Sequence, residues 1–320
     1  MSLKSTAKSF LGNRSYVYVR NLRYTRTASF LRAAPNFPSQ WFRQRANAPY
    51  FPFDFRVPIG MGAMLTHVVQ LLAYAEQNSL TPVCRISNPL YADGPDVFSK
   101  YFEMRPEGAP ADRELLFHTI KTAEDYTLFK PAAEPTLNEM NRVFHKYIGF
   151  SRRVSDAVER FLLDVPRYPK LGIHYRGTDK ISEAPEVGYQ EVFTAVEEYL
   201  KTLDTDLIFL ATDSNNFSQA VRREFSKINF ISFDSETNMD IDGPRHFSGL
   251  SSDEKAMEAI ANMVLLSRCE VCIRTASQLS VWGRILNKNL RTVTLNRPFI
   301  STAYPENLVW DEMETLRPPT

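Results

Sequence analysis

The second half of the chain predicts an α/β fold built on a parallel, doubly wound sheet. Short apolar runs alternate there with amphipathic stretches of helical length. The continuous apolar run 207–211 is typical of a strand buried on both faces, and strands that alternate with single helices form parallel sheets. Polar clusters follow three of the strands. Because ligands bind beyond the carboxyl ends of such strands, these clusters predict a site.

The expected elements follow one another along this half. The strands are expected at residues 171–175, 207–211, 229–233, 271–273 and 292–295. The helices are expected at residues 188–201, 215–226 and 253–267, and from residue 275 to residue 286. In the third helix, helical spacing turns four apolar residues toward the core, namely Ala256, Ile260, Met263 and Val264.

The first of these strands runs directly into the longest polar cluster, residues 174–183. Alternation along the strand puts His174 and Arg176 on the same face. A permanently charged guanidinium beside a neutral imidazole suits a phosphate or carboxylate ligand. The alternative is a core strand in which Arg176 pairs with an acid.

The first half of the chain is more irregular. Gly60 and Gly62 precede a predicted helix at residues 63–77, and these glycines either permit a tight turn or let a ligand approach the backbone. The remaining expectations are a strand at 15–19, an irregular segment rich in proline and aromatic residues at 21–59, a strand at 80–84, mixed structure at 93–134, mainly helix at 135–166 and a boundary at 167–169.

Composition limits the class of protein. With 320 residues and 43% apolar content, the chain can form two domains of about 150 residues each. A net charge of +1 argues against a nucleic-acid partner or an anionic membrane surface. No apolar run approaches the ~20 residues of a membrane span, and the N-terminus has no signal-peptide pattern. We therefore expect a cytoplasmic protein.

The cysteines and histidines argue against disulfides and metals. Cys84, Cys269 and Cys272 are too few for a disulfide framework, and the last two fall in or beside a predicted strand, as reduced packing residues. The five histidines lack the paired spacing of metal ligands. We expect no metal site.

Three polar motifs occur in a defined order. They are His-Tyr-Arg-Gly-Thr-Asp-Lys at 174–180, Leu-Ala-Thr-Asp at 210–213 and Thr-Ala-Ser-Gln at 275–278. Together they resemble the three peptide motifs of α1,6-type fucosyltransferases, which include nodulation-factor and core fucosyltransferases, with protein O-fucosyltransferases as more distant relatives. The stretch 60–70 is similar to the glycine-rich start of the family's first long helix. The resemblance covers about residues 59–80 and 171–295.

The chain departs from the family pattern at two places. The family's first motif usually carries two adjacent arginines, whereas here Gly177 follows Arg176. The segment between Lys180 and Glu183 is one residue shorter than in the α1,6 enzymes. The first departure leaves Arg176 to hold a diphosphate without an arginine neighbour, and the second leaves the position of the site carboxylate open.

The resemblance implies a GT-B-like fold, in which two Rossmann-like domains face a cleft. We expect an acceptor-side domain at residues 1–168 and a nucleotide-sugar-binding domain at residues 169–320. The implied activity is inverting transfer of fucose from GDP-fucose, without a metal or other cofactor, to a hydroxyl of a glycan or lipo-oligosaccharide. The expected lack of an anchor and of disulfides fits a bacterial enzyme better than the animal core enzymes.

We expect the diphosphate to be held by Arg176, because its planar fork offers two charged donors to developing negative charge. The helix that opens at Thr275 adds free amides and the positive end of its dipole, and the hydroxyls of Ser277 and Ser280 can contribute. This arrangement needs no metal ion.

The guanine and the fucose of the donor each have candidate binding residues. Asp213 can accept hydrogen bonds from guanine N1 and N2, although it could instead cap the following helix, a task that Ser214 could also perform. The resemblance places Gln278 near the fucose. Ser277 and Gln278 could equally be ordinary first-turn residues.

The catalytic base is expected to be Glu183, a carboxylate near the first motif. Asp179 and Glu186 are its rivals, and Asp179 could instead pair with Arg176. Lys180 is expected to hold the acid's charge or contact the phosphate. Two other functions stay open: transfer from another nucleotide-sugar donor on the same fold, and binding of a nucleotide or sugar without catalysis.

Overall fold

The computed structural model describes residues 49–91, 98–105, 115–165, 167–177, 184–233, 250–299 and 304–316. The strand predicted at 15–19 lies outside the described residues, as do Asp179, Lys180 and Glu183.

The C-terminal half is built on a five-stranded sheet of order β10-β9-β6-β7-β8. Its strands are β6 (Leu171–Tyr175), β7 (Leu207–Thr212), β8 (Asn229–Ile231), β9 (Val271–Arg274) and β10 (Arg291–Thr294). All pairings are parallel, as predicted. The chain starts at the central strand β6, goes outward through β7 and β8, and returns to β9 on the other side. Its topological switch point, the usual place for a ligand, therefore lies between β6 and β9.

Helices cover both faces of this sheet. They are α9 (Tyr189–Leu200), α10 (Asn215–Glu224), α11 (Ser252–Ser267) and α12 (Gln278–Leu286). Apolar side chains of α9 and α10 pack with one face, and those of α11 and α12 pack with the other. The predicted fourth helix starts later than residue 275, because Ser277 is its N-cap. A further helix, α13 (Glu306–Leu316), was not predicted.

The N-terminal half contains a three-stranded parallel sheet of order β2-β1-β4. Its strands are β1 (Tyr50–Phe55), β2 (Thr81–Ile86) and β4 (His118–Ile120). The expectation that residues 21–59 are irregular throughout is wrong for β1. Pro52 is tolerated in this central strand because β4 pairs only with Phe53 and the residues after it, so at Pro52 β1 has one neighbour.

The other elements of this half are mostly helical. They are α4 (Met61–Gln77), α5 (Phe98–Tyr101), α6 (Ala123–Thr127), α7 (Leu137–Tyr147) and α8 (Arg152–Leu163), with a small antiparallel pair of β3 (Phe102–Met104) and β5 (Ile148–Phe150). Helix α4 begins two residues before its predicted start. The helix expected across 135–166 is divided into α7 and α8 by β5.

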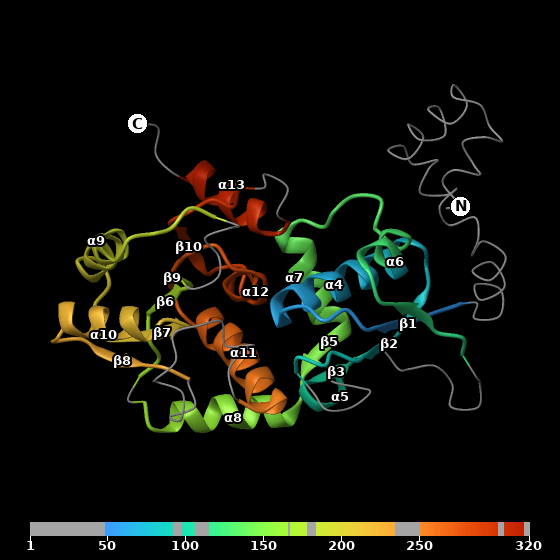
Figure 1. Cartoon of the computed structure of the whole chain (residues 1–320), viewed down its shortest axis with the longest axis horizontal. Coiled ribbons are helices and arrows are strands. Elements are labelled where there is room, and N and C mark those ends of the chain that lie inside the picture. Colours follow the sequence, from blue (N-terminus) through green and yellow to red (C-terminus); the bar gives the residue numbers. More distant parts are fainter. Residues whose placement is uncertain are drawn as a thin grey trace, which may run out of the picture.

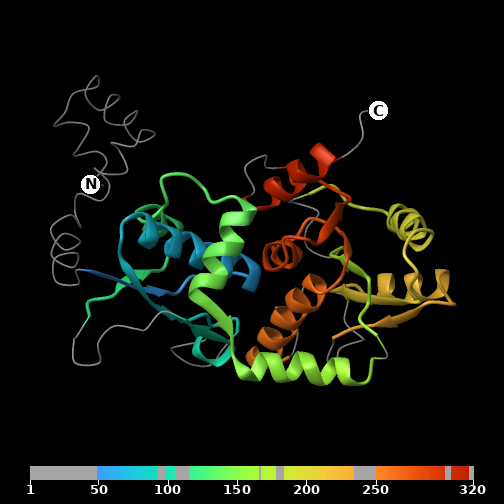
Figure 2. The same cartoon turned by 180° about the vertical axis from the view of Figure 1, so that it is seen from behind.

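The two halves lie side by side and share one hydrophobic cluster (Figures 1 and 2). Helix α4 of the N-terminal half packs against α12 of the C-terminal half, and α8 runs along one edge of the molecule beside α11. Trp282 of α12 is fully buried and donates from Nε1 to the Gly62 carbonyl of α4, at 2.7 Å. In the part of the chain that the structure describes, no helix has the length and apolar character of a membrane span.

Candidate active site

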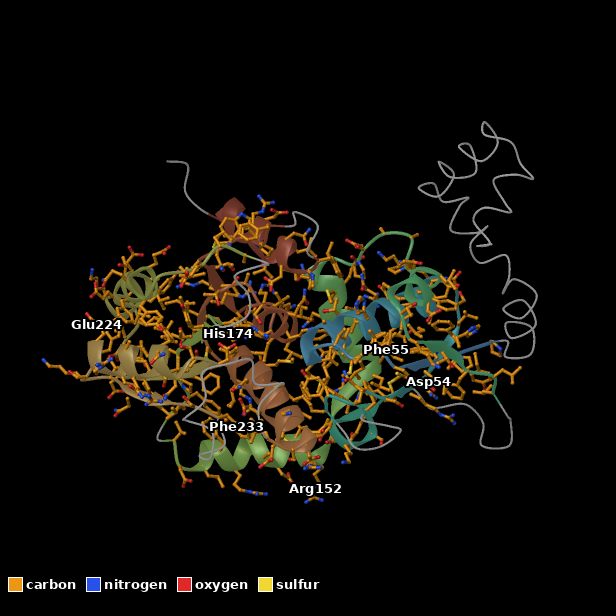
Figure 3. All side chains as sticks on the ribbon, viewed as in Figure 1. Asp54, Phe55, Arg152, His174, Glu224 and Phe233 are labelled. Carbon is orange, nitrogen blue, oxygen red and sulfur yellow. The ribbon has the colours of Figure 1, made fainter. Side chains whose placement is uncertain are left out.

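A cavity of about 90 Å³ opens at the carboxyl ends of β6 and β7. Its polar lining comes from three places: His174, Arg176 and Asp213 beside the strands, Lys255, Glu258 and Asn262 on α11, and Tyr91 from the N-terminal half. Figure 3 shows His174 in the C-terminal half on the side that faces the other half, whereas Asp54 lies far away. The cavity is thus bounded by both halves.

Arg176 is fixed by neighbours from two strand ends. Its Nε lies 3.7 Å from Asp213 Oδ2, and its backbone amide donates to Thr275 Oγ1 at 2.9 Å. Asp213 Oδ1 accepts from the Gly177 amide at 3.3 Å. The Arg176 side chain is 20% exposed and that of Asp213 only 8%. The acid that pairs with Arg176 among the described residues is therefore Asp213, and the guanidinium still reaches the cavity.

His174 lies on the same face as Arg176, as alternation predicted, and is buried. Burial, together with the positive charges of Arg274 and Arg176, lowers the pKa of His174 to about 3. The imidazole is therefore neutral at ordinary pH, and its Nδ1 accepts or donates no hydrogen bond within the described ranges. A neutral imidazole can bind a polar ligand atom but adds no charge to the site.

The third motif forms the turn between β9 and α12. Ser277 caps α12, accepting from the Leu279 amide at 3.3 Å. Ser280 is fully buried and accepts from Arg274 Nε at 2.8 Å, which argues against its expected contact with a diphosphate. Gln278 donates from Nε2 to the Tyr304 carbonyl at 3.1 Å, and its Oε1 accepts from Thr66 at 3.3 Å. Gln278 therefore also links the two halves.

The two glycines before and within α4 have different surroundings. A Cβ at Gly62 would lie 2.6 Å from the backbone carbon and oxygen of Gln278, whereas a Cβ at Gly60 would have only the Tyr91 hydroxyl nearby, at 3.9 Å. Gly62 thus allows the first turns of α4 and α12 to touch. Two helix amino ends, each with free amides and a positive dipole end, meet at this point. The Tyr91 hydroxyl accepts from the Met61 amide at 2.9 Å.

Sequence reasoning missed the wall that α11 contributes. Lys255, Glu258, Ala259 and Asn262 line the cavity at helical spacing. Glu258 and Asn262 are each less than 9% exposed. The signal was a polar stripe on a helix whose other faces are apolar, but the interpretation considered only the apolar stripe. Tyr91 gave no local signal, because only the fold brings it to Arg176.

The described residues do not identify the catalytic base. Glu183, Asp179 and Lys180 lie outside them, and the rival Glu186 is exposed. No cluster of three or more potential metal ligands occurs in the described ranges. The roles of these residues stay predictions.

Solved structures share this fold. One is a NodZ α1,6-fucosyltransferase soaked with GDP-fucose, with a TM-score of 0.52 and 16% identity over 74% of this chain and 93% of that one. Another is POFUT1 in complex with GDP, with a TM-score of 0.50 and 10% identity over 76% and 98% of the respective chains. A NodZ structure from Bradyrhizobium gives a TM-score of 0.48 at 16% identity, over 74% and 94%. The first two likenesses define a GT-B-like α/β fold, as the sequence resemblance implied.

The family follows from the sequence itself. The family model for nodulation protein Z (NodZ) matches residues 139–302, about half of the chain. The protein belongs to the NodZ family, which confirms the predicted relationship to α1,6-type fucosyltransferases. No curated protein sequence matches the chain significantly.

Proposed function

We propose that this protein is an inverting fucosyltransferase that uses GDP-fucose as donor and a hydroxyl of a glycan or lipo-oligosaccharide as acceptor. The observation that carries the proposal is the position of Arg176. It is held at the switch point of the sheet, and its guanidinium lines the cavity. Family membership supports it, as do the similar structures that were soaked with GDP-fucose or are in complex with GDP.

The reaction separates a charged leaving group from the sugar. The acceptor oxygen attacks fucose C1, the bond from C1 to the diphosphate oxygen breaks, and GDP departs. Arg176 donates to the diphosphate, and the adjoining amino ends of α4 and α12 add backbone amides. Glu183 removes the acceptor proton, with Asp179 and Lys180 as its neighbours in sequence. With these groups the reaction needs no metal ion, so we expect transfer to survive excess EDTA.

The guanine has two sets of candidate partners. Asp213 stays our proposal from sequence, but its carboxylate already binds the Gly177 amide and faces Arg176. Glu258 and Asn262 offer further hydrogen-bonding groups on the α11 wall. The variant Asp213→Asn separates a role in guanine recognition from a role in orienting Arg176. If Asp213 recognises guanine, the variant weakens binding of GDP more than binding of IDP, which lacks the N2 amine. If Asp213 only orients Arg176, the variant weakens binding of both nucleotides equally.

Donor choice and catalysis are tested with the purified protein. Calorimetric titration should show binding of GDP in preference to UDP and CMP, and labelled GDP-fucose should yield a labelled product on a glycan array. Preference for another nucleotide would reassign the donor. GDP binding without hydrolysis or transfer would leave a nucleotide-binding protein. We also propose a cytoplasmic location in a bacterium, which the three free cysteines support.

A further inference from the structure

A buried ion pair joins the end of β9 to the start of α13, beside the turn that leads from β9 to α12. Arg274, the last residue of β9, is 0% exposed and Glu306, the first residue of α13, is 4% exposed. Arg274 Nη2 donates to Glu306 Oε2 at 2.6 Å. The desolvation penalty of two buried charges offsets much of the energy of their attraction. Such a pair is therefore weak evidence of a purely stabilising role.

The buried guanidinium of Arg274 donates hydrogen bonds to the turn between β9 and α12 and to the start of α12. Nη2 donates to the Ser277 carbonyl at 3.0 Å, and Nε donates to the Ser280 hydroxyl at 2.8 Å. Nη1 donates to Thr294 Oγ1 on the adjacent strand at 3.2 Å. Because Ser277 is the N-cap of α12, Arg274 holds the place where the free amides of this helix begin.

The same turn holds Arg176. Thr275 Oγ1 accepts from the Arg176 amide, so a shift of the turn moves the residue that we expect to bind the diphosphate. Tyr304, just before α13, also contacts the start of α12, because its carbonyl accepts from Gln278 Nε2. The carboxylate of Glu306 lies in the first turn of α13, where the helix dipole favours negative charge.

We propose that Arg274 and Glu306 are positioning residues, through which α13 holds the β9–α12 turn, and with it Arg176, in the conformation that binds the donor diphosphate. This inference rests on the proposed function. It gives α13, which no motif marked in the sequence, a part in donor binding without contact with the donor.

The test replaces the charges by apolar side chains of similar size. Such a replacement of a buried pair is often neutral for stability, so Arg274→Met/Glu306→Leu should fold while losing the bonds to the turn. We expect its GDP dissociation constant and its KM for GDP-fucose to rise at least about tenfold. Hydrogen exchange of the amides at 275–279 should also be faster in the protein without ligand.

A control ion pair also binds α13, but it starts from α12 instead of β9. Arg284 of α12 binds Glu312 of α13 through two hydrogen bonds but does not contact the turn in any hydrogen bond that we observe. Arg284→Met/Glu312→Leu should keep GDP affinity within about twofold of the parent and leave exchange at 275–279 unchanged.

The outcomes separate the inference from the proposed function. If the Arg274/Glu306 double variant is folded and binds GDP like the parent, the positioning role is refuted. If this variant does not fold, Glu306→Gln replaces it, and unchanged exchange of the turn amides in that protein refutes the role. If the parent itself does not bind GDP, the proposed function fails, while exchange at 275–279 still shows whether the pair orders the turn.

Discussion

Arg176 is oriented before any ligand binds, by Asp213 at its guanidinium and by Thr275 at its amide. We predict that Arg176→Ala weakens GDP binding by ~1.5 to 3 kcal/mol and abolishes transfer, because charged hydrogen bonds to the diphosphate are lost. Arg176→Lys should recover only part of this, since a point charge does not reproduce the planar fork. Calorimetric titration of the three proteins with GDP is the measurement. A folded Arg176→Ala protein with parental affinity would remove Arg176 from the site.

The lowered pKa of His174 predicts how the stability of the protein depends on pH. Its pKa is about 3 in the folded protein, below the ordinary value near 6.5, so acid protonates it first in the unfolded state. The stability from neutral His174 is fully present above pH 6.5 and is lost progressively as the pH falls toward 3. Between pH 8 and pH 5 the parent should lose about 2 kcal/mol more stability than His174→Gln. Urea unfolding of both proteins at the two pH values measures this. Equal losses would show that His174 is protonated at pH 5 when folded.

At this scale the sequence predicted side chains that lie at strand ends. Alternation put His174 and Arg176 on one face, and both line the cavity. The sequence could not predict that Tyr91 and the polar side chains of α11 line the same cavity, because this depends on how distant elements pack. Nor did the spacing of Asp213 show that its carboxylate would face Arg176.

The adjoining ends of α4 and α12 lead to a prediction about helix packing. Gly62→Ala should destabilise the protein by about 1 to 3 kcal/mol, because the new Cβ overlaps the Gln278 backbone and the helices must separate. Gly60→Ala is the control, since its Cβ has no atom closer than 3.9 Å. Thermal and urea unfolding compare the two variants. Equal stabilities would mean that the helices accommodate the methyl group.

Elements were predicted well where their pattern was local. The helices and strands of the C-terminal sheet follow from apolar periodicity, and Ser277 explains why α12 starts after residue 275. Strand β1 was missed because the many prolines of 21–59 suggested an irregular segment and outweighed the alternating Phe51, Phe53 and Phe55, all of which are buried. Helix α13 was missed because the series of strands and helices was interpreted as complete at β10.

At the scale of the whole molecule, one hydrophobic cluster of the described residues continues across both halves, and a second lies on the α9 and α10 face of the C-terminal sheet. We therefore predict that the full chain unfolds in a single calorimetric transition, and that residues 169–320 alone do not fold, because α12 would expose the face that α4 and α7 cover. Two separate transitions, or a folded C-terminal fragment, would support the independent domains predicted at 1–168 and 169–320. The sequence could not decide this, since apolar periodicity shows that a helix face is buried but not which element buries it.

The bond between Trp282 and Gly62 also makes the protein its own optical probe. The indole is fully buried and its N–H is bound to the first turn of α4, so its emission depends on the contact between the two helix ends. The other tryptophans of the chain are Trp41 and Trp310, and replacing both by phenylalanine removes their background emission. In that protein the fluorescence of Trp282 would follow any movement of α4 against α12 in real time, without an attached dye.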